Sequence, residues 1–140
     1  MGNINWERVF LGGLLAGIVA NVLGFGAWFL FLAKPWSAAL QELGRPIRET
    51  GSFYVFWIVW YFVVGITIIW LYAAIRPRFN PGPRTAAIAG IAYWIVGGVI
   101  PTIAWQSLTK LPAGLLTKDQ VTYLVILVVA AMVGAWPYKE

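Results

Sequence analysis

Four long runs of hydrophobic residues divide the chain, and short segments rich in polar residues, Pro or Gly separate them. The runs cover residues 9–33, 52–75, 86–107 and 120–137. A helix needs about 17–25 residues to cross a bilayer, so each run has about the length of a membrane span. No run alternates apolar and polar residues as a barrel strand does, and an open sheet cannot cross lipid. The pattern predicts an all-α transmembrane four-helix bundle, a single domain over residues 1–140.

Two shorter features refine this architecture. Residues 35–44 have Pro at a first-turn position, apolar residues on one face and Gly at the end, which predicts a short interfacial helix after the first span. The triplet Ala-Gly-Ile at 16–18 recurs at 89–91. If this echo reflects duplication, the first and third spans are equivalent and the bundle consists of two parallel hairpins. Chance recurrence in apolar helices is the alternative.

Composition supports a membrane location and excludes several kinds of chemistry. Hydrophobic residues make up 61% of the chain and charged residues 11%, against roughly 45–50% and about 25% in soluble domains. The chain has no Cys and no His, so disulfides, thiolate sites and the commonest metal and haem ligand are missing. We therefore expect no enzymatic activity, no cofactor, no metal and no nucleic-acid partner.

Carboxylates are expected only outside the spans. The acidic residues are Glu7, Glu42, Glu49, Asp119 and Glu140. General acid–base catalysis and proton-coupled export both require a titratable group at a suitable site, and in a membrane the relevant groups lie within the spans. Their expected absence argues against both functions.

Basic residues predict the orientation. Five Lys or Arg residues fall on each side of the predicted bundle: Arg8, Arg76, Arg78, Arg84 and Lys139 on the side of the termini, and Lys34, Arg45, Arg48, Lys110 and Lys118 on the other. Arg76, Arg78 and Arg84 are concentrated in one short turn without an acidic neighbour, where we expect contact with lipid headgroups. This concentration favours cytoplasmic termini. The equal totals keep dual insertion as an alternative.

The spans contain few polar side chains, and four of them are predicted to form an intramembrane polar cluster. The most polar is Asn21, which shares a helix face with Gly13 and Gly17, as in close helix contacts. At about 1.5 Å per residue, antiparallel spans bring Asn21 to the depth of Tyr61, with which we expect a hydrogen bond. The four residues are Asn21, Tyr61, Thr67 and Tyr93. Three roles are open for Asn21: a contact within the bundle, a contact with a ligand, or a contact between subunits.

The second span presents two different faces. Tyrosine hydroxyls at membrane depth need hydrogen-bond partners, so we expect Tyr54, Tyr61 and Tyr72 to face the bundle. A second face, consisting of Phe53, Trp57, Trp60 and Val64, then points outward. Trp57 and Trp60 lie deeper than the usual interfacial belt. We interpret this face as a docking site for a partner helix, a lipid or another hydrophobic molecule, with a plain lipid-facing surface as the alternative.

The third span contains Gly97 and Pro101. Proline at 101 cannot donate a hydrogen bond to the carbonyl of residue 97, and its ring clashes with the preceding turn. The pair predicts a helix kink.

Three stretches carry a resemblance. They are Trp6-Glu7-Arg8, Gly12-Gly13-Leu14-Leu15-Ala16-Gly17 and residues 71–86, LYAAIRPRFNPGPRTA. They resemble a group of uncharacterised small bacterial four-span proteins. The resemblance implies a bacterial inner membrane but no settled activity.

Two functions remain compatible with the sequence. We favour a non-catalytic accessory or structural subunit that packs on a larger membrane complex or associates with itself. The alternative is a small channel or carrier for a small solute, with Asn21, Tyr61 and Thr67 along its path. The expected partners are membrane lipids, other membrane subunits or further copies of the chain, and a bound hydrophobic molecule.

Overall fold

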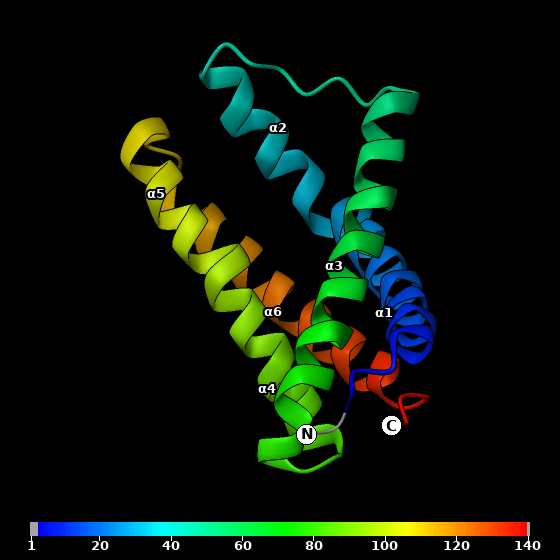
Figure 1. Cartoon of the computed structure of the whole chain (residues 1–140). Coiled ribbons are helices and arrows are strands. Elements are labelled where there is room, and N and C mark those ends of the chain that lie inside the picture. The colour runs from blue at the N-terminus through cyan, green and yellow to red at the C-terminus, as the bar shows by residue number, and fades with distance from the viewer. Residues whose placement is uncertain (1–2, 140) are drawn as a thin grey trace.

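The chain folds into helices joined by short connections in a computed structural model that describes residues 3–139 (Figure 1). Its elements are α1 (Trp6–Ala27), the π-helical turn η1 (Trp28–Leu32), α2 (Ala33–Glu42), α3 (Gly51–Phe79), α4 (Pro83–Trp94), the π-helical turn η2 (Ile95–Val99), α5 (Ile100–Thr109) and α6 (Ala113–Ala135). They form four continuous helices that are long and apolar enough to cross a membrane. The predicted all-α transmembrane four-helix bundle is confirmed.

The first helix is longer than the sequence predicted. η1 joins α1 and α2 into one helix, Trp6–Glu42, so residues 35–42 are its last turns and not a separate helix. The helix stops where expected, and Gly44 follows with a φ of 70°, which glycine adopts without steric cost. Its 37 residues extend about 55 Å, well beyond the roughly 30 Å hydrocarbon core of a bilayer.

Both π-helical turns lie just before a proline. η1 ends at Leu32, three residues before Pro35, and η2 ends at Val99, two residues before Pro101. A proline inside a helix leaves the carbonyl of the preceding turn without its donor, and a widened turn relieves the clash with the ring. A π-helical turn therefore lies where the sequence predicted a helix kink at Gly97 and Pro101, and the kink itself stays a prediction. The π-helical turn before Pro35 was not predicted.

Small residues bring α1, α3 and α6 into close contact near the middle of the bundle. A Cβ added to Gly65 of α3 would lie 2.6 Å from the Gly13 carbonyl oxygen and 2.9 Å from the Gly17 Cα of α1. Gly12 of α1 and Gly134 of α6 meet in the same way. The face that contains Gly13 and Gly17 is therefore the close helix contact predicted from the sequence.

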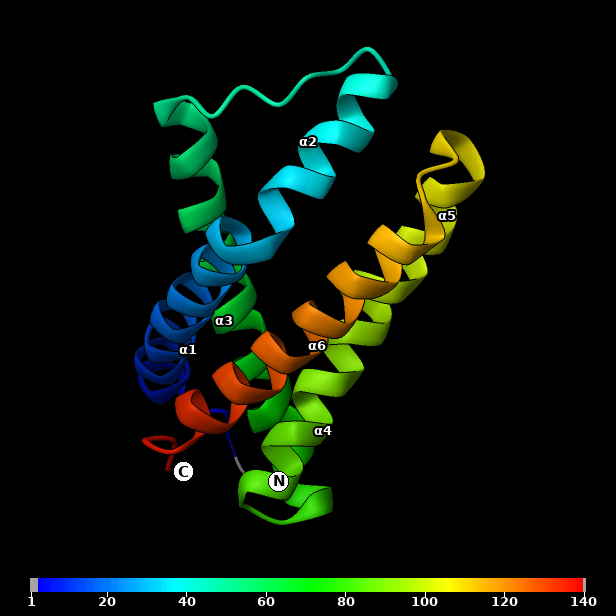
Figure 2. The ribbon, with the colours of Figure 1, turned by 180° about the vertical axis from the view of Figure 1, so that it is seen from behind.

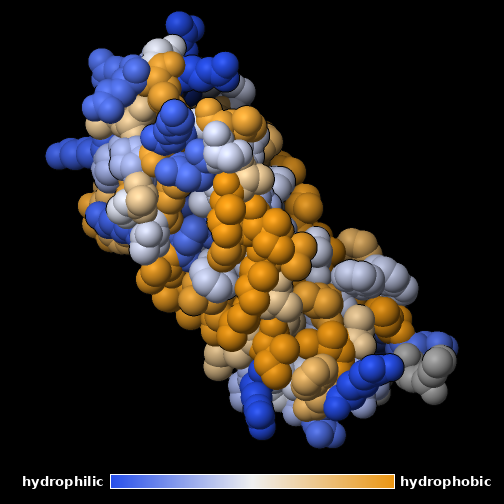
Figure 3. Space-filling model, turned by 90° about the vertical axis from the view of Figure 1, so that its left-hand side faces the viewer, coloured by the Kyte–Doolittle hydropathy of each residue, from blue (hydrophilic) through white to orange (hydrophobic). Residues whose placement is uncertain are grey.

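The helices form two hairpins. The first consists of α1, η1, α2 and α3, and the second of α4, η2, α5 and α6 (Figure 2). The two hairpins contact each other mainly where α1 packs on α6. The two chain ends lie together, because the Asn5 backbone N–H donates to the Tyr138 hydroxyl over 3.3 Å. A broad hydrophobic surface separates the hydrophilic ends of the molecule in one side view (Figure 3). Many large hydrophobic side chains are exposed, and Leu30 and Leu108 are about four-fifths exposed. Lipid would cover such a surface.

Candidate functional site: an aromatic cavity

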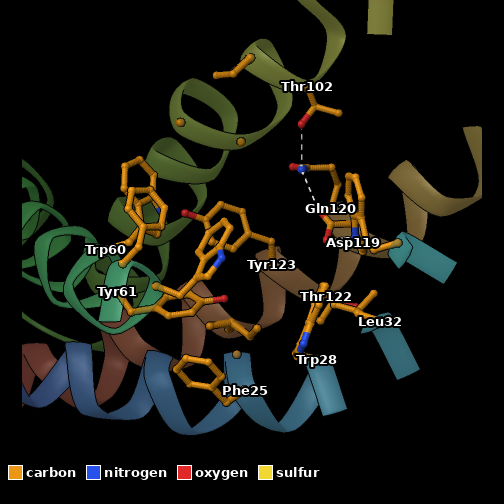
Figure 4. A pocket seen from close by; sticks show the side chains of 18 of the residues that line it. Phe25, Trp28, Leu32, Trp60, Tyr61, Thr102, Asp119, Gln120, Thr122 and Tyr123 are labelled. Carbon is orange, nitrogen blue, oxygen red and sulfur yellow. Dashed lines mark hydrogen bonds between the residues drawn. The ribbon is translucent and has the colours of Figure 1, made fainter. Parts of the chain in front are cut away.

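The hairpins diverge at the end of the bundle opposite the termini (Figure 1). Side chains from both hairpins line a cavity of about 530 Å³ there (Figure 4). Ligand pockets typically measure about 300–1,000 Å³, so this cavity has room for a small molecule. Ten of the 22 residues that line it are aromatic, and they come from both hairpins: Phe25, Trp28, Trp36, Phe53, Phe56, Trp57, Trp60, Tyr61, Trp105 and Tyr123.

Half of these aromatic residues come from the first turns of α3. They recur at steps of three and four residues, which places them on one helix face. Phe56 stacks on Trp60 with 6.1 Å between ring centroids, and Trp57 lies 6.4 Å from Tyr61. Trp28 of η1 meets the same wall, 5.9 Å from Phe53. The rings therefore support one another and form a wall that exists before any ligand binds.

The cavity is open where its lining side chains on α3 and α5 are exposed. These two helices lie apart at this end of the molecule in both Figure 1 and Figure 2. Phe56 on one side and Trp105 on the other line the cavity, yet their side chains are 57% and 63% exposed. In a membrane this opening would face the lipid, so a hydrophobic molecule could enter from the bilayer.

Glycines position two of the lining side chains. A Cβ on Gly24 of α1 would lie 2.5 Å from the Tyr61 hydroxyl oxygen, and one on Gly98 of η2 would lie 2.8 Å from Gln120 Oε1. Tyr61 and Gln120 therefore occupy space that any larger residue would fill. The cavity wall depends on the absence of side chains at Gly24 and Gly98.

Polar groups gather on the side of the cavity formed by α5 and α6 (Figure 4). Asp119 Oδ1 accepts from the Trp36 indole over 3.1 Å, and Asp119 Oδ2 accepts from Gln120 Nε2 over 3.4 Å. Gln120 Nε2 also donates to the Thr102 hydroxyl over 2.9 Å. The backbone carbonyl of Gln120 accepts from the Trp94 indole. The network links both hairpins around one carboxylate.

The position of Asp119 corrects an expectation from the sequence. It was placed in a connection, outside the spans, whereas α6 begins at Ala113 and contains Asp119 in its second turn. Ala113–Ala135 is itself the fourth candidate membrane span. The argument against carrier function from the lack of a carboxylate in the spans therefore no longer holds.

Three of the four residues of the predicted docking face line the cavity, and docking itself stays a prediction. Phe53, Trp57 and Trp60 share a face and line the cavity, where Trp57 is 37% and Trp60 40% exposed. The prediction that Val64 points outward is wrong, because its side chain is completely buried in the core between the helices. The reason is that α3 is buried towards its middle, where α1 packs on it, so a stripe along the helix changes surroundings from one end to the other.

The predicted polar cluster does not come together. The Asn21 side chain donates to the backbone carbonyls of Gly17 and Ile58, and the expected hydrogen bond to Tyr61 is not formed. Thr67 donates to the Val63 carbonyl on its own helix. Tyr61 lines the cavity, and Tyr93 packs against the hydrophobic core. Backbone carbonyls thus accept from the Asn21 amide and the Thr67 hydroxyl, while the Asn21 Oδ1 atom is buried without a hydrogen-bond partner among the described residues.

The basic turn lies at the opposite end of the bundle, with the termini. Arg78 and Arg84 are exposed and free to meet headgroups, whereas Arg76 is half-buried, with its guanidinium 5.4 Å from the centre of the Tyr138 ring. The turn itself is held by Thr85, whose hydroxyl donates to the Phe79 and Asn80 carbonyls.

Sequence analysis missed the polar side of the cavity. Asp119, Thr122, Tyr123 and Ile126 have the i, i+3, i+4, i+7 spacing of a single helix face, and all four line the cavity. This signal becomes visible only if the fourth helix begins before Asp119, directly after Leu111-Pro112. A start at residue 120, chosen on hydrophobicity, concealed it.

Comparison of the chain with known protein families, with curated proteins and with solved structures finds no match. The geometry of the cavity is therefore the basis for a functional assignment.

Proposed function

We propose that the protein is a non-catalytic membrane protein that binds a hydrophobic or amphipathic small molecule in the cavity between its hairpins. One observation carries this proposal: Trp57 and Trp60, in the first turns of α3, line a cavity of about 530 Å³ with aromatic residues of both hairpins. Large rigid aromatics bind apolar surfaces at little cost in conformational entropy. A few polar groups at one side would orient the molecule.

The same observation bears on the accessory-subunit interpretation. That interpretation required an outward aromatic face with no neighbour in the monomer. Trp57 and Trp60 instead face aromatic residues of the same chain across a cavity, which favours a small bound molecule over a partner helix as the occupant. Association with a larger complex or with a second copy is still compatible with the lipid-facing outer surface.

A carrier is the second candidate, favoured by Asp119. The carboxylate lies in a candidate span and lines a cavity between two hairpins. Carboxylates in such positions mark cation and proton pathways in membrane proteins. The two π-helical turns lie beside the cavity, where helix irregularities serve as hinges in many proteins. Uptake of a labelled hydrophobic cation into proteoliposomes, absent in Asp119→Asn, would favour a carrier over a binding protein.

We further propose a bacterial inner membrane with both termini and the Arg78–Arg84 turn in the cytoplasm. Basic residues resist translocation, and residues 76–84 contain three arginines and no acid. In this orientation the cavity lies in the outer half of the bilayer, so its opening would receive molecules from the outer leaflet.

Photolabelling tests the proposed binding function. The purified protein in phosphatidylglycerol nanodiscs is irradiated with a neutral diazirine-bearing dodecanol, and the modified peptides are mapped by mass spectrometry. We expect labels concentrated on the cavity faces of α3 and α6. The variant Thr122→Trp fills the cavity and should lose them, whereas Thr117→Trp, at an exposed position on the same helix, should keep them. Labels spread evenly over the outer surface would contradict the proposal.

A further inference from the structure

We infer that the molecule bound in this cavity carries a cationic head, a quaternary ammonium or a similar organic cation, which Asp119 and the surrounding rings hold. The inference rests on the proposed function and assigns a ligand class to the same site. It depends on three features of the lining: its single charge, its aromatic content and its lack of the groups that a metal or an anion would need.

The charge of the lining is negative. Asp119 is the one charged side chain that lines the cavity, and it forms no ion pair with any of the residues 3–139. The adjacent Lys118 is directed elsewhere, with its ammonium 5.1 Å from the centre of the Phe31 ring. Beside Asp119, the Gln120 Oε1 atom is buried without a hydrogen-bond donor. Two electron-rich oxygen groups thus lie together without a positive partner among residues 3–139.

A carboxylate in the membrane-spanning part of a protein has a large desolvation free energy unless a positive charge neutralises it. The hydrogen bonds from Trp36 and Gln120 use only part of its capacity, because an ionised carboxylate has about four lone-pair sites. A ligand cation in the cavity would supply the missing charge.

The aromatic rings suit the same kind of head. A cation near the face of an indole or phenol ring is attracted by the ring quadrupole, and Trp is the strongest such partner. Trp36 is hydrogen-bonded to Asp119, and Tyr123 follows Asp119 by one turn of α6. The carboxylate and the rings therefore attract the same charge, while the apolar walls accommodate alkyl substituents on the cation better than a hydration shell.

Other charged ligands fit less well. No group of three or more acidic side chains that could hold a metal ion exists among the described residues. An anion would meet Asp119 without any Lys or Arg in the lining to offset it. An organic cation with an apolar tail meets both the carboxylate and the aromatic wall.

Competition against the neutral photoprobe tests the inference. Dodecyltrimethylammonium and its uncharged isostere 2,2-dimethyltetradecane are titrated over the same range of mole fractions in phosphatidylglycerol nanodiscs, whose lipid carries no ammonium group. We expect the cation to suppress cavity labelling at an about tenfold lower mole fraction than the hydrocarbon. Asp119→Asn should abolish this preference, and Glu42→Gln, which neutralises an exposed carboxylate outside the cavity, should retain it.

The outcomes separate the inference from the proposed function. Equal competition by cation and hydrocarbon in the wild type, or a preference that persists in Asp119→Asn, overturns the cationic assignment while the cavity remains a binding site. If neither competitor suppresses labelling of the cavity peptides, the proposed binding function fails and the inference fails with it.

Discussion

Trp36 and Asp119 connect the two hairpins across the cavity, because the Trp36 indole N–H donates to the Asp119 carboxylate over 3.1 Å. Beside this bond, Ala39 of α2 packs with Leu111 and Leu115 in a hydrophobic cluster separate from the main core. The end of the long first helix is therefore tied to the start of α6. This contact keeps the hairpins together where they otherwise diverge.

The substitution Trp36→Phe should weaken this connection. It removes the donor and leaves the Asp119 carboxylate with one fewer hydrogen bond, so we expect the free energy of unfolding to fall by about 1–3 kcal/mol. Unfolding in mixed micelles of increasing dodecyl sulfate content measures the change. Trp105→Phe is the control, because the Trp105 indole lines the same cavity without a hydrogen bond to the described residues. Equal effects of the two substitutions would show that the bond contributes nothing.

Gly17→Ala should destabilise the bundle through the contact of α1 with α3. The added Cβ would lie 2.9 Å from the Phe62 Cα, a backbone atom that cannot move aside without shifting the helix. We expect a loss of about 1–3 kcal/mol. Gly26→Ala on the same long helix is the matched control, since a Cβ there meets nothing within 4 Å. Thermal denaturation in detergent compares the two variants, and a Gly17→Ala melting point equal to that of the control contradicts the close packing.

Trp60→Leu should reduce binding of the neutral photoprobe about tenfold, the effect of losing one well-packed aromatic contact. Trp70→Leu should not. The two indoles lie on the same helix and are almost equally exposed, at 40% and 41%, but only Trp60 lines the cavity. Similar losses in both variants would mean that the probe senses the outer surface of α3.

Cysteine labelling tests the orientation. The chain has no Cys of its own, so single substitutions at the exposed Asn80 and Gln41 report on opposite ends of the bundle. A membrane-impermeant maleimide should modify Gln41→Cys in intact cells and should leave Asn80→Cys unmodified until the membrane is permeabilised. Modification of both positions to the same extent would demonstrate dual insertion.

Hydrophobic patterning predicted the four helices and the close contact at Gly17, because both follow from local composition. The buried middle of α3 was predictable only in part. Tyr72 is buried as expected, but the face shared by Phe53 and Val64 changes from cavity to core along the helix. Such a change depends on where neighbouring helices approach, which no single helix encodes.

The cavity could not be predicted, because it arises from the divergence of the two hairpins. Its carboxylate was concealed by the choice of helix start: the run that begins near residue 120 excludes Asp119, although α6 begins at Ala113. The prediction for Asn21 failed for a related reason. Depth along antiparallel helices predicted a hydrogen bond to a side chain, whereas the Asn21 amide donates to the backbone carbonyl of Ile58.

A crystal structure grown in a lipidic phase with 1-bromododecane tests the central claim most directly, because bromine can be located by its anomalous scattering. The compound is neutral, so the result does not depend on the charge of the natural ligand. We predict a bromine or its alkyl chain between Trp57, Trp60 and Tyr123, within the cavity. Bromine found only on the outer surface, or a helix of a second protein molecule inserted between α3 and α5, would contradict the assignment of the cavity as a small-molecule binding site.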